Sequence, residues 1–224
     1  MSQTGKQQAR DNFDVKALTA LVASLAPGKL KTAEMTVTYR VQQQFYDQQK
    51  SAALSLFCPE NEQQKGRWNG RQQDFGLTYL ANSPKGALAE AFSHVTPNPK
   101  GERFFDSRML APREMSKVVF TGPLTLIDVR ALLPQLKLSA QDIEGDDVYH
   151  ITQPLADALY LMFAKDVHGI LYSSRWSGDL LDCAAIWSHP PVGQTEQTPL
   201  DDFEYQGMDS YEILCEQLNF AFTG

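Results

Sequence analysis

The sequence FGLTYLANSPKGALAEAF, residues 75–92, predicts a β-strand that passes directly into a helix. Phe75, Leu77 and Tyr79 occupy alternate positions of its first half, which is the period-two pattern of a half-buried strand. The Ser-Pro pair that follows can cap a helix and fill its first position. The stretch therefore joins a strand to a short helix with almost no loop between them.

The same two periods predict further elements along the chain. The run MTVTYRV, residues 35–41, alternates apolar and polar residues and ends its polar face at Arg40, as a strand does. Residues 11–26 have the apolar spacing of an amphipathic helix, and the next Pro-Gly pair ends it. Other expected elements are strands at KVVF and LTLIDV, broken by Gly122-Pro123, a helix starting within Thr152–Pro154, and strands at GILYSS and LDCAAIW.

These strands and helices mix without a regular βαβ alternation, which favours an α+β fold with a compact mixed sheet and flanking helices. The Gln-rich residues 42–65 are expected to form a loop, and residues 188–202, with three prolines, a loop or linker. A terminal helix is expected at 211–222. We therefore divide the chain into an N-terminal helical extension (1–34), a main domain (35–187), and a C-terminal loop and helix packed on that domain (188–224).

The composition is that of one globular domain. The chain has 224 residues, of which 42% are hydrophobic, and a chain of this length can bury a sizeable core. It carries 20 Lys and Arg residues against 27 Asp and Glu residues, so its formal net charge is −7. Such a surface repels phosphodiester backbones on average, and direct binding to nucleic acid is not expected.

The cysteines and histidines predict neither a disulfide framework nor a metal site. Cys58, Cys183 and Cys215 have no CxxC spacing, and the four histidines lack the spacing of zinc ligands. The polar N-terminal residues contain no apolar core of signal-peptide type, and no window approaches the roughly 18 apolar residues of a membrane span. We expect a soluble, cytoplasmic protein.

No standard nucleotide-binding or hydrolase motif is present, neither a phosphate loop nor GxGxxG nor GxSxG. A nucleotide would therefore be held by side chains. Arg40 could bind a diphosphate with its guanidinium fork, or it could form a structural salt bridge. In GRWNG, residues 66–70, Arg67 adds a second cation and Trp68 a large anchor, but the run could equally be a tight turn with the tryptophan in the core.

Two further segments carry candidate side chains. Glu90 is a carboxylate within the otherwise small and apolar segment ALAEAF, where it has either a partner or a chemical task, or is simply an exposed surface residue. In GILYSS, residues 169–174, strand alternation sends Tyr172 and Ser174 to the same side. By themselves these residues identify no reaction.

Taken in order, the motifs resemble the RES domain family, which is named for its Arg, Glu and Ser. The family pattern has an aromatic-Arg strand, a glycine-bracketed RWN, a Tyr-containing strand, Ala-Leu-Ala-Glu, and Gly-hydrophobic-x-Tyr-x-Ser. In this chain the corresponding pieces are Tyr39-Arg40, GRWNG, LTYLANS, GALAEAF and GILYSS. The resemblance covers Val37 to Trp187 and implies a fold similar to that of the ADP-ribosyltransferases.

The resemblance also implies an activity. Family members degrade NAD by phosphorolysis or hydrolysis, usually as the toxin of a toxin–antitoxin pair with a helix-turn-helix antitoxin. NAD would be the substrate and inorganic phosphate a co-substrate, with no cofactor. Arg40 and Arg67 would bind the diphosphate or an incoming phosphate, Glu90 would face the nicotinamide ribose, and Ser174 would orient the carboxamide or ribose. The other implied substrate-binding residues are Trp68, Asn69, Tyr79 and Tyr172.

Elementary chemistry agrees with a carboxylate at this place. Cleavage of the nicotinamide–ribose bond builds positive charge on the ribose, and a nearby carboxylate stabilises that charge. Phosphate, water or a protein side chain could attack the same carbon, so phosphorylase, glycohydrolase and protein ADP-ribosyltransferase remain alternatives, together with a non-catalytic partner-binding module. The polar residues 94–117 could form a lid, an antitoxin surface or an exposed loop.

Overall fold

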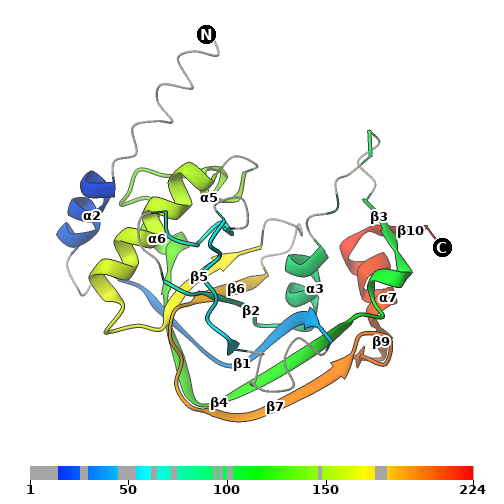
Figure 1. The fold of residues 1–224 in the computed structure, drawn as a ribbon. Helices are drawn as coiled ribbons and strands as arrows, with labels where there is room; N and C mark the ends of the chain where they lie inside the picture. Colours follow the sequence, from blue (N-terminus) through cyan, green and yellow to red (C-terminus); the bar gives the residue numbers. More distant parts are fainter. Residues whose placement is uncertain are drawn as a thin grey trace.

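The sheet at the centre of the fold is curved and mixed. The structure is a computed structural model that describes residues 15–25, 30–44, 54–61, 65–71, 75–92, 95, 98–99, 103–145, 148–174 and 181–223 (Figure 1). Six strands lie in the order β1, β2, β6, β5, β4, β7, and all pairs are antiparallel except β4 with β5. Their bounds are β1 Thr32–Gln43, β2 Thr78–Ala81, β4 Arg113–Asp128, β5 Gly169–Ser173, β6 Asp182–Ile186 and β7 Val192–Pro199.

Five of these strands close into a ring, because β1 pairs with β4 as well as with β2. The inner face of the ring buries an apolar cluster to which α2, α3 and α6 contribute no residue: Met35, Leu54, Leu80, Val118, Phe120, Leu124, Leu126, Leu171, Ala184 and Ile186. The ladder between β1 and β2 is short, with Tyr39 opposite Ala81. The two strands therefore diverge soon after they meet.

Helices cover the outer face of the sheet. Helix α2 (Val15–Ser24) packs against α6 (Tyr149–Phe163), and α3 (Pro84–Phe92) packs against β1 and against the π-helical turn η5 (Ile213–Gln217). Figure 1 shows α2 and α6 together at one end of the molecule and α3 with α7 (Ser210–Glu212) at the other. The short helices are η4 Ser107–Met109, α4 Val129–Leu132 and α5 Gln141–Glu144. This arrangement confirms the predicted α+β class.

The strand predicted to break at Gly122-Pro123 is continuous, so the expectation of two separate strands was wrong. Strand β4 runs through both residues, but its pairing with β1 shifts there, since Met35 faces Leu124 whereas Val37 faces Val119. Two steps along β1 thus correspond to five along β4, which is a bulge. A bulge tolerates proline because the extra residues need no partner for their backbone amides.

The expected loop at 188–202 was also wrong, because β7 occupies most of it. This strand pairs with β4 from Phe120 opposite Val192 to Glu114 opposite Pro199. Nearly all of its side chains are exposed, and its sequence VGQTEQTP has no apolar face. An edge strand that buries neither face leaves no alternating pattern from which it could be predicted.

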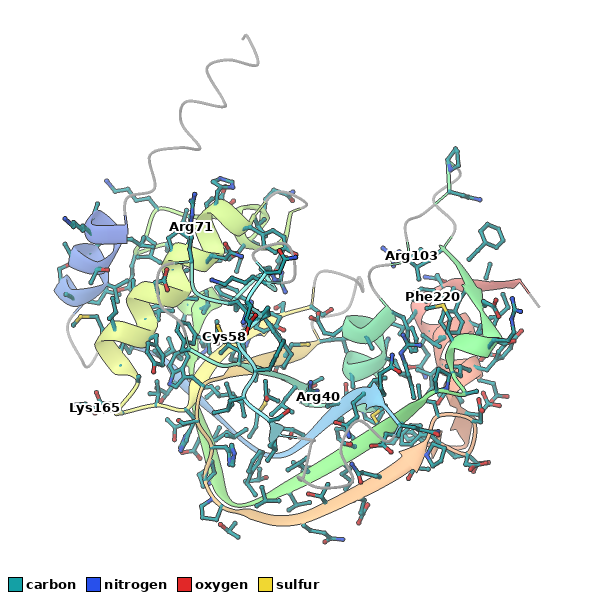
Figure 2. All side chains as sticks on the ribbon, in the orientation of Figure 1. Arg40, Cys58, Arg71, Arg103, Lys165 and Phe220 are labelled. Carbon is teal, nitrogen blue, oxygen red and sulfur yellow. The ribbon has the colours of Figure 1, made fainter. Side chains whose placement is uncertain are left out.

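The C-terminal segment ends in a strand, which contradicts a helix through residue 222. Strand β10 (Phe220–Thr223) pairs in parallel with β3 (Arg103–Asp106), and β8 (Glu204–Tyr205) pairs with β9 (Met208–Asp209). Figure 2 shows Arg103 beside Phe220, and the guanidinium carbon lies 5.8 Å from the ring centroid. Of the alternatives for residues 94–117, the exposed loop is therefore wrong where β3 and the start of β4 form. His94 lies outside the described residues.

Two boundaries differ from the prediction in detail. Helix α6 begins at Tyr149, ahead of the predicted start, and accommodates Pro154 within its early turns. In the predicted loop 42–65, the first two residues extend β1, and Phe57 forms an isolated bridge with Leu77. Residues 45–53 and 62–64 of this segment lie outside the described part of the chain.

Candidate active site

A cavity of about 250 Å³ opens where β1 and β2 diverge beside α3. It is bounded by these elements, the turn at 66–67, the start of α6 and the end of β5. The lining residues are Tyr39, Arg40, Val41, Gly66, Arg67, Tyr79, Leu80, Ala81, Ala87, Glu90, Ala91, Tyr149 and Tyr172. Segments far apart in the sequence thus contribute polar side chains to one space.

The run GRWNG folds into a tight turn that is fastened to β2 by Tyr79. The side-chain oxygen Oδ1 of Asn69 accepts hydrogen bonds from the Gly66 amide at 2.8 Å and from the Tyr79 hydroxyl at 3.1 Å. The Tyr79 hydroxyl in turn accepts one from the Trp68 amide at 3.1 Å. A Cβ atom at Gly66 would lie 2.6 Å from that hydroxyl, so only glycine fits.

The turn is also fastened to α6. The amide of Arg71 donates to a carboxylate oxygen of the fully buried Asp157 at 2.9 Å, and the Lys65 ammonium donates to the Gly70 carbonyl at 3.1 Å. Burial raises the pKa of the Tyr79 phenol far above its usual value, so its hydroxyl keeps the proton that it donates to Asn69. The backbone around residue 67 is therefore held from two sides.

Arg67 is a buried cation with aromatic neighbours. Its side chain is almost enclosed, with the residue 8% exposed. The guanidinium carbon lies 4.7 Å from the centre of the Tyr172 ring and 5.8 Å from that of Trp68, and Nη1 donates to the Ile143 carbonyl at 2.9 Å. These contacts fix the plane of the guanidinium against the ring of Tyr172.

Glu90 is half-buried on α3 and faces β5. The hydroxyl of Tyr172 donates to its Oε2 atom over 3.3 Å. Burial is the main cause that raises the pKa of Tyr172 well above the ordinary value of a phenol, and the Glu90 carboxylate adds to it. The phenol is therefore a permanent donor at ordinary pH. The half-burial and this contact exclude the alternative of an exposed surface residue.

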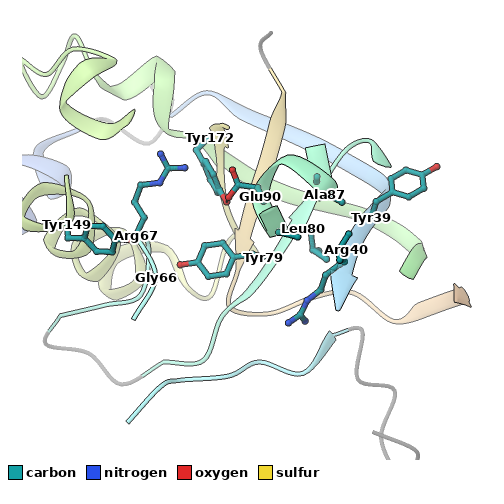
Figure 3. A pocket seen from close by; sticks show the side chains of 13 residues that line it. Tyr39, Arg40, Gly66, Arg67, Tyr79, Leu80, Ala87, Glu90, Tyr149 and Tyr172 are labelled. Carbon is teal, nitrogen blue, oxygen red and sulfur yellow. The ribbon is translucent and has the colours of Figure 1, made fainter. Parts of the chain in front are cut away.

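The two predicted cations lie on different sides of the cavity. Figure 3 shows Arg40 on one side, Arg67 on the other, and Glu90, Tyr172 and Tyr79 between them. Arg40 is half-buried and stands opposite Ser116 in the β1–β4 ladder. The cavity therefore has a cationic group at each end and a carboxylate in its middle.

The structure brings together five of the eight predicted site residues: Arg40, Arg67, Tyr79, Glu90 and Tyr172. Trp68, Asn69 and Ser174 do not line the cavity. Trp68 is fully buried against Tyr172, with ring centroids 5.5 Å apart, and Asn69 holds the turn together. Ser174 is buried just beyond β5, where its amide donates to the Leu181 carbonyl at 2.9 Å.

Sequence reasoning missed Tyr149, which lines the cavity from the first turn of α6. Nothing in its local sequence distinguishes it from an ordinary helix residue. It also did not assign Tyr39 a place in the cavity, although the aromatic-Arg pair contained it. Tyr39 contacts Tyr205 edge to face, with ring centroids 6.5 Å apart, and burial raises the pKa of its phenol.

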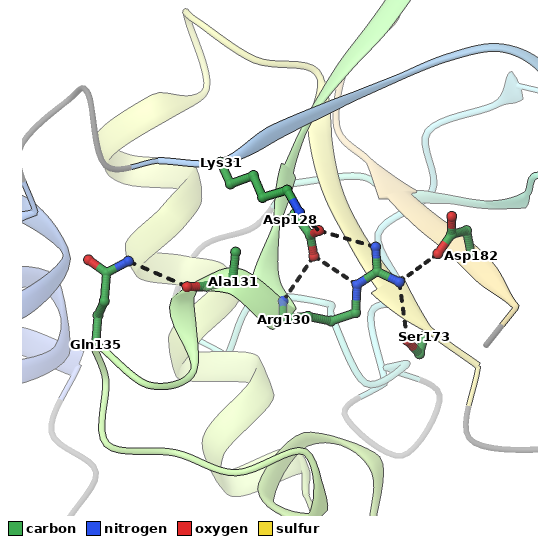
Figure 4. Close-up of polar contacts among 7 residues, drawn as sticks. All are labelled: Lys31, Asp128, Arg130, Ala131, Gln135, Ser173 and Asp182. Atoms are coloured by element: carbon green, nitrogen blue, oxygen red, sulfur yellow. Dashed lines mark hydrogen bonds and ion pairs between the residues drawn. The ribbon is translucent and has the colours of Figure 1, made fainter.

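A separate ion-pair network joins three strand ends on the neighbouring part of the sheet (Figure 4). Arg130 donates to Asp182 at 2.6 Å, to Asp128 at 2.8 and 3.2 Å, and to the Ser173 hydroxyl at 3.4 Å. Lys31 approaches Asp128 to 3.9 Å. The network ties β4, β5 and β6 together one residue away from Tyr172.

Two observations concern other kinds of site. Among the residues that the structure describes, no three His, Cys, Asp or Glu side chains are grouped as metal ligands would be. None of the helices in the described part of the chain combines the length and apolar character that a membrane span requires.

Comparison with known proteins identifies a family and a solved structure with the same fold. The model of the RES domain matches residues 36–206. No curated protein matches the sequence. A solved structure with the same fold is a chain of the M. tuberculosis MbcT–MbcA toxin–antitoxin complex, with 19% sequence identity and a TM-score of 0.52. The match covers 82% of this chain and 92% of the other.

Proposed function

The chain belongs to the RES domain family, and from this premise we propose that it is an enzyme that cleaves the bond between nicotinamide and ribose in NAD. The observation that carries the proposal is that Arg40, Arg67, Tyr79, Glu90 and Tyr172 line one and the same cavity. These residues come from separate stretches of the sequence. A carboxylate flanked by two guanidinium groups suits a substrate that combines a ribosyl cation in its transition state with a diphosphate.

In the proposed reaction the bond between ribose C1′ and the pyridinium nitrogen breaks. Its electron pair passes to the nitrogen, nicotinamide leaves as a neutral molecule, and positive charge develops on the ribose. The Glu90 carboxylate stabilises this charge. An oxygen of inorganic phosphate then bonds to C1′ and gives ADP-ribose 1″-phosphate. Attack by water gives ADP-ribose, with release of a proton.

The size of the cavity fits one end of NAD. About 250 Å³ is below the roughly 300–1,000 Å³ of pockets that enclose a drug-sized ligand. We therefore assign the nicotinamide ribose to the space between Glu90 and Tyr79, with the remainder of the dinucleotide extending past Arg40. A guanidinium fork can bind two phosphate oxygens at once. We therefore assign binding of the diphosphate to Arg40. Ser174 does not line the cavity, and the proposed arrangement gives it no contact with the substrate.

We also infer that the chain acts as a toxin in the cytoplasm and is neutralised by a helix-turn-helix antitoxin. The support is family membership together with the fold shared with a chain of the MbcT–MbcA toxin–antitoxin complex. Expression of the wild-type chain alone should deplete cellular NAD and stop growth. Expression of a Glu90→Gln variant at equal level should do neither.

Phosphorus NMR of NAD incubated with the purified protein tests the activity. In phosphate buffer, phosphorolysis produces ADP-ribose 1″-phosphate with a new phosphomonoester signal, whereas hydrolysis produces ADP-ribose in any buffer. Loss of NAD with ADP-ribose attached to protein would instead indicate ADP-ribosyl transfer. NAD that stays intact in every buffer after prolonged incubation would reject the proposed function.

A further inference from the structure

The contacts of Arg67 differ from those expected of a residue that grips phosphate. Of its donors, Nη1 is committed to the Ile143 carbonyl, and one face of its guanidinium is close to the Tyr172 ring. The residue is 8% exposed. A phosphate-binding arginine presents the edge of its fork to the anion, so the contacts of Arg67 with protein leave less of that edge available.

Tyr172 stands between Arg67 and Glu90. Its ring faces the guanidinium at 4.7 Å, and its hydroxyl donates to Glu90 Oε2 at 3.3 Å. The ring also packs against Trp68, which is fully buried, with centroids 5.5 Å apart. The Tyr172 ring therefore has little freedom to rotate. Arg67 and Trp68, both from the GRWNG turn, fix the direction in which its hydroxyl points.

We propose that Arg67 and Tyr172 are positioning residues that act on the reaction by orienting the Glu90 carboxylate. This inference rests on the proposed function and deepens it. Arg67 stacks on the ring, the ring directs the hydroxyl, and the hydroxyl holds one carboxylate oxygen. The other oxygen can then face the ribose. Asn69 and Tyr79 hold the GRWNG turn in place, and this turn positions Arg67 against the Tyr172 ring.

Steady-state kinetics of nicotinamide release separate positioning from phosphate binding. In the Tyr172→Phe variant, which loses one oxygen atom, kcat should fall about 10- to 100-fold, the size of a lost hydrogen bond to a charged group, while KM for NAD and for phosphate stays within about twofold. Arg67→Lys should behave alike, because an ammonium keeps the charge but cannot stack as a plane. A raised KM at unchanged kcat in Arg67→Lys would overturn the proposal.

The double variant Tyr172→Phe/Arg67→Lys tests whether the two residues act in series. If Arg67 works through the tyrosine hydroxyl, the double variant is no slower than the slower single variant. Multiplication of the two single effects would contradict the proposal. Arg103→Gln is the matched control, because it removes an arginine that lies over another aromatic ring, Phe220, away from the cavity. Its kcat should equal that of the wild type.

Crystal structures of the same variants test the positioning of Glu90 independently of whether the protein cleaves NAD. If wild-type protein leaves NAD intact, the proposed function fails. The inference about geometry is then decided by Arg67→Lys, in which the Tyr172 ring should rotate and its hydroxyl should leave Glu90. An unmoved Tyr172 hydroxyl in that variant would reject it whatever the activity.

Discussion

The Tyr79 hydroxyl donates a hydrogen bond to Oδ1 of Asn69 across 3.1 Å, and this bond ties a central strand to the GRWNG turn. Asn69 uses the same oxygen to accept from the Gly66 amide. Both residues were predicted to touch the substrate, but the contacts described here are with the protein. They hold in place the turn that carries Arg67.

Gly66→Ala should disrupt this turn. The added methyl group would lie 2.6 Å from the Tyr79 hydroxyl, so the turn or the tyrosine must move. We expect a loss of unfolding free energy of about 1–3 kcal/mol in urea titrations, the usual cost of overpacking, and a clear loss of NAD cleavage. The matched control is Gly122→Ala, where the methyl group meets nothing within 4 Å. Equal stability of both variants would contradict the prediction.

Glu90→Gln should abolish most of the proposed activity without unfolding the protein. The amide keeps the size of the carboxylate and can still accept from Tyr172, but it carries no negative charge to stabilise the ribosyl cation. We expect kcat to fall by about 10²–10³-fold, as for the loss of one preorganised electrostatic group. The exposed Glu204→Gln serves as control. A Glu90→Gln variant as active as wild type would remove the carboxylate from the mechanism.

Arg40→Gln should weaken substrate binding. If the guanidinium holds the diphosphate, its loss raises KM for NAD about 10- to 100-fold, as for other charged hydrogen bonds. Calorimetric titration of ADP-ribose, which retains the diphosphate, should show the same loss of affinity. Arg108→Gln removes an exposed arginine paired with Asp106 and should change neither quantity. Unaltered ADP-ribose affinity in Arg40→Gln would assign the diphosphate to another residue.

Arg130→Gln should destabilise the protein by about 1–3 kcal/mol, because it leaves the nearly buried Asp128 carboxylate without its main partner. Urea unfolding monitored by tryptophan fluorescence measures this change. The exposed pair of Lys117 and Glu196 provides the comparison, and Lys117→Gln should leave the midpoint essentially unchanged. The prediction fails if the two variants unfold at the same urea concentration.

Stability should decrease as the pH falls toward 5, in part through His168. Burial is the main cause that lowers the pKa of this imidazole, whose Nδ1 accepts from the Thr125 amide at 3.0 Å. A folded pKa below the unfolded one means that the unfolded state binds the proton first. The stabilisation is thus complete above about pH 6.5 and is lost on acidification. Urea midpoints at pH 7.5 and 5.5 should differ less in His168→Gln than in wild type.

Sequence patterns predicted those elements that bury one or both faces. Strands β1, β2, β5 and β6 alternate apolar side chains or run through the core, and α3 follows a recognisable Ser-Pro start. Strand β7 could not be predicted because it buries neither face. The bulge in β4 could not be distinguished from a strand break, because Gly122-Pro123 is compatible with both. Tertiary pairing decides such cases, and local sequence does not contain it.

The candidate site was predictable as a set of residues but not as an arrangement. The order of the motifs identified Arg40, Arg67, Tyr79, Glu90 and Tyr172, and all of them line one cavity. Which side chain contacts the substrate and which supports a neighbour depends on closure of the strand ring, a long-range event. For that reason the sequence could not show that Asn69 and Trp68 lie outside the cavity lining. Tyr149 could not be found at all.

The packing of β10 has a consequence for protein synthesis. Phe92, at the end of the helix that carries Glu90, contacts Phe105 with centroids 4.7 Å apart, and Phe105 in turn meets Phe220 and Phe222. A ribosome makes this helix long before it makes the two later phenylalanines. The nascent chain therefore holds every proposed catalytic group while the helix still lacks part of its support. The aromatic packing against the end of this helix is therefore complete only after residue 222 has been synthesised.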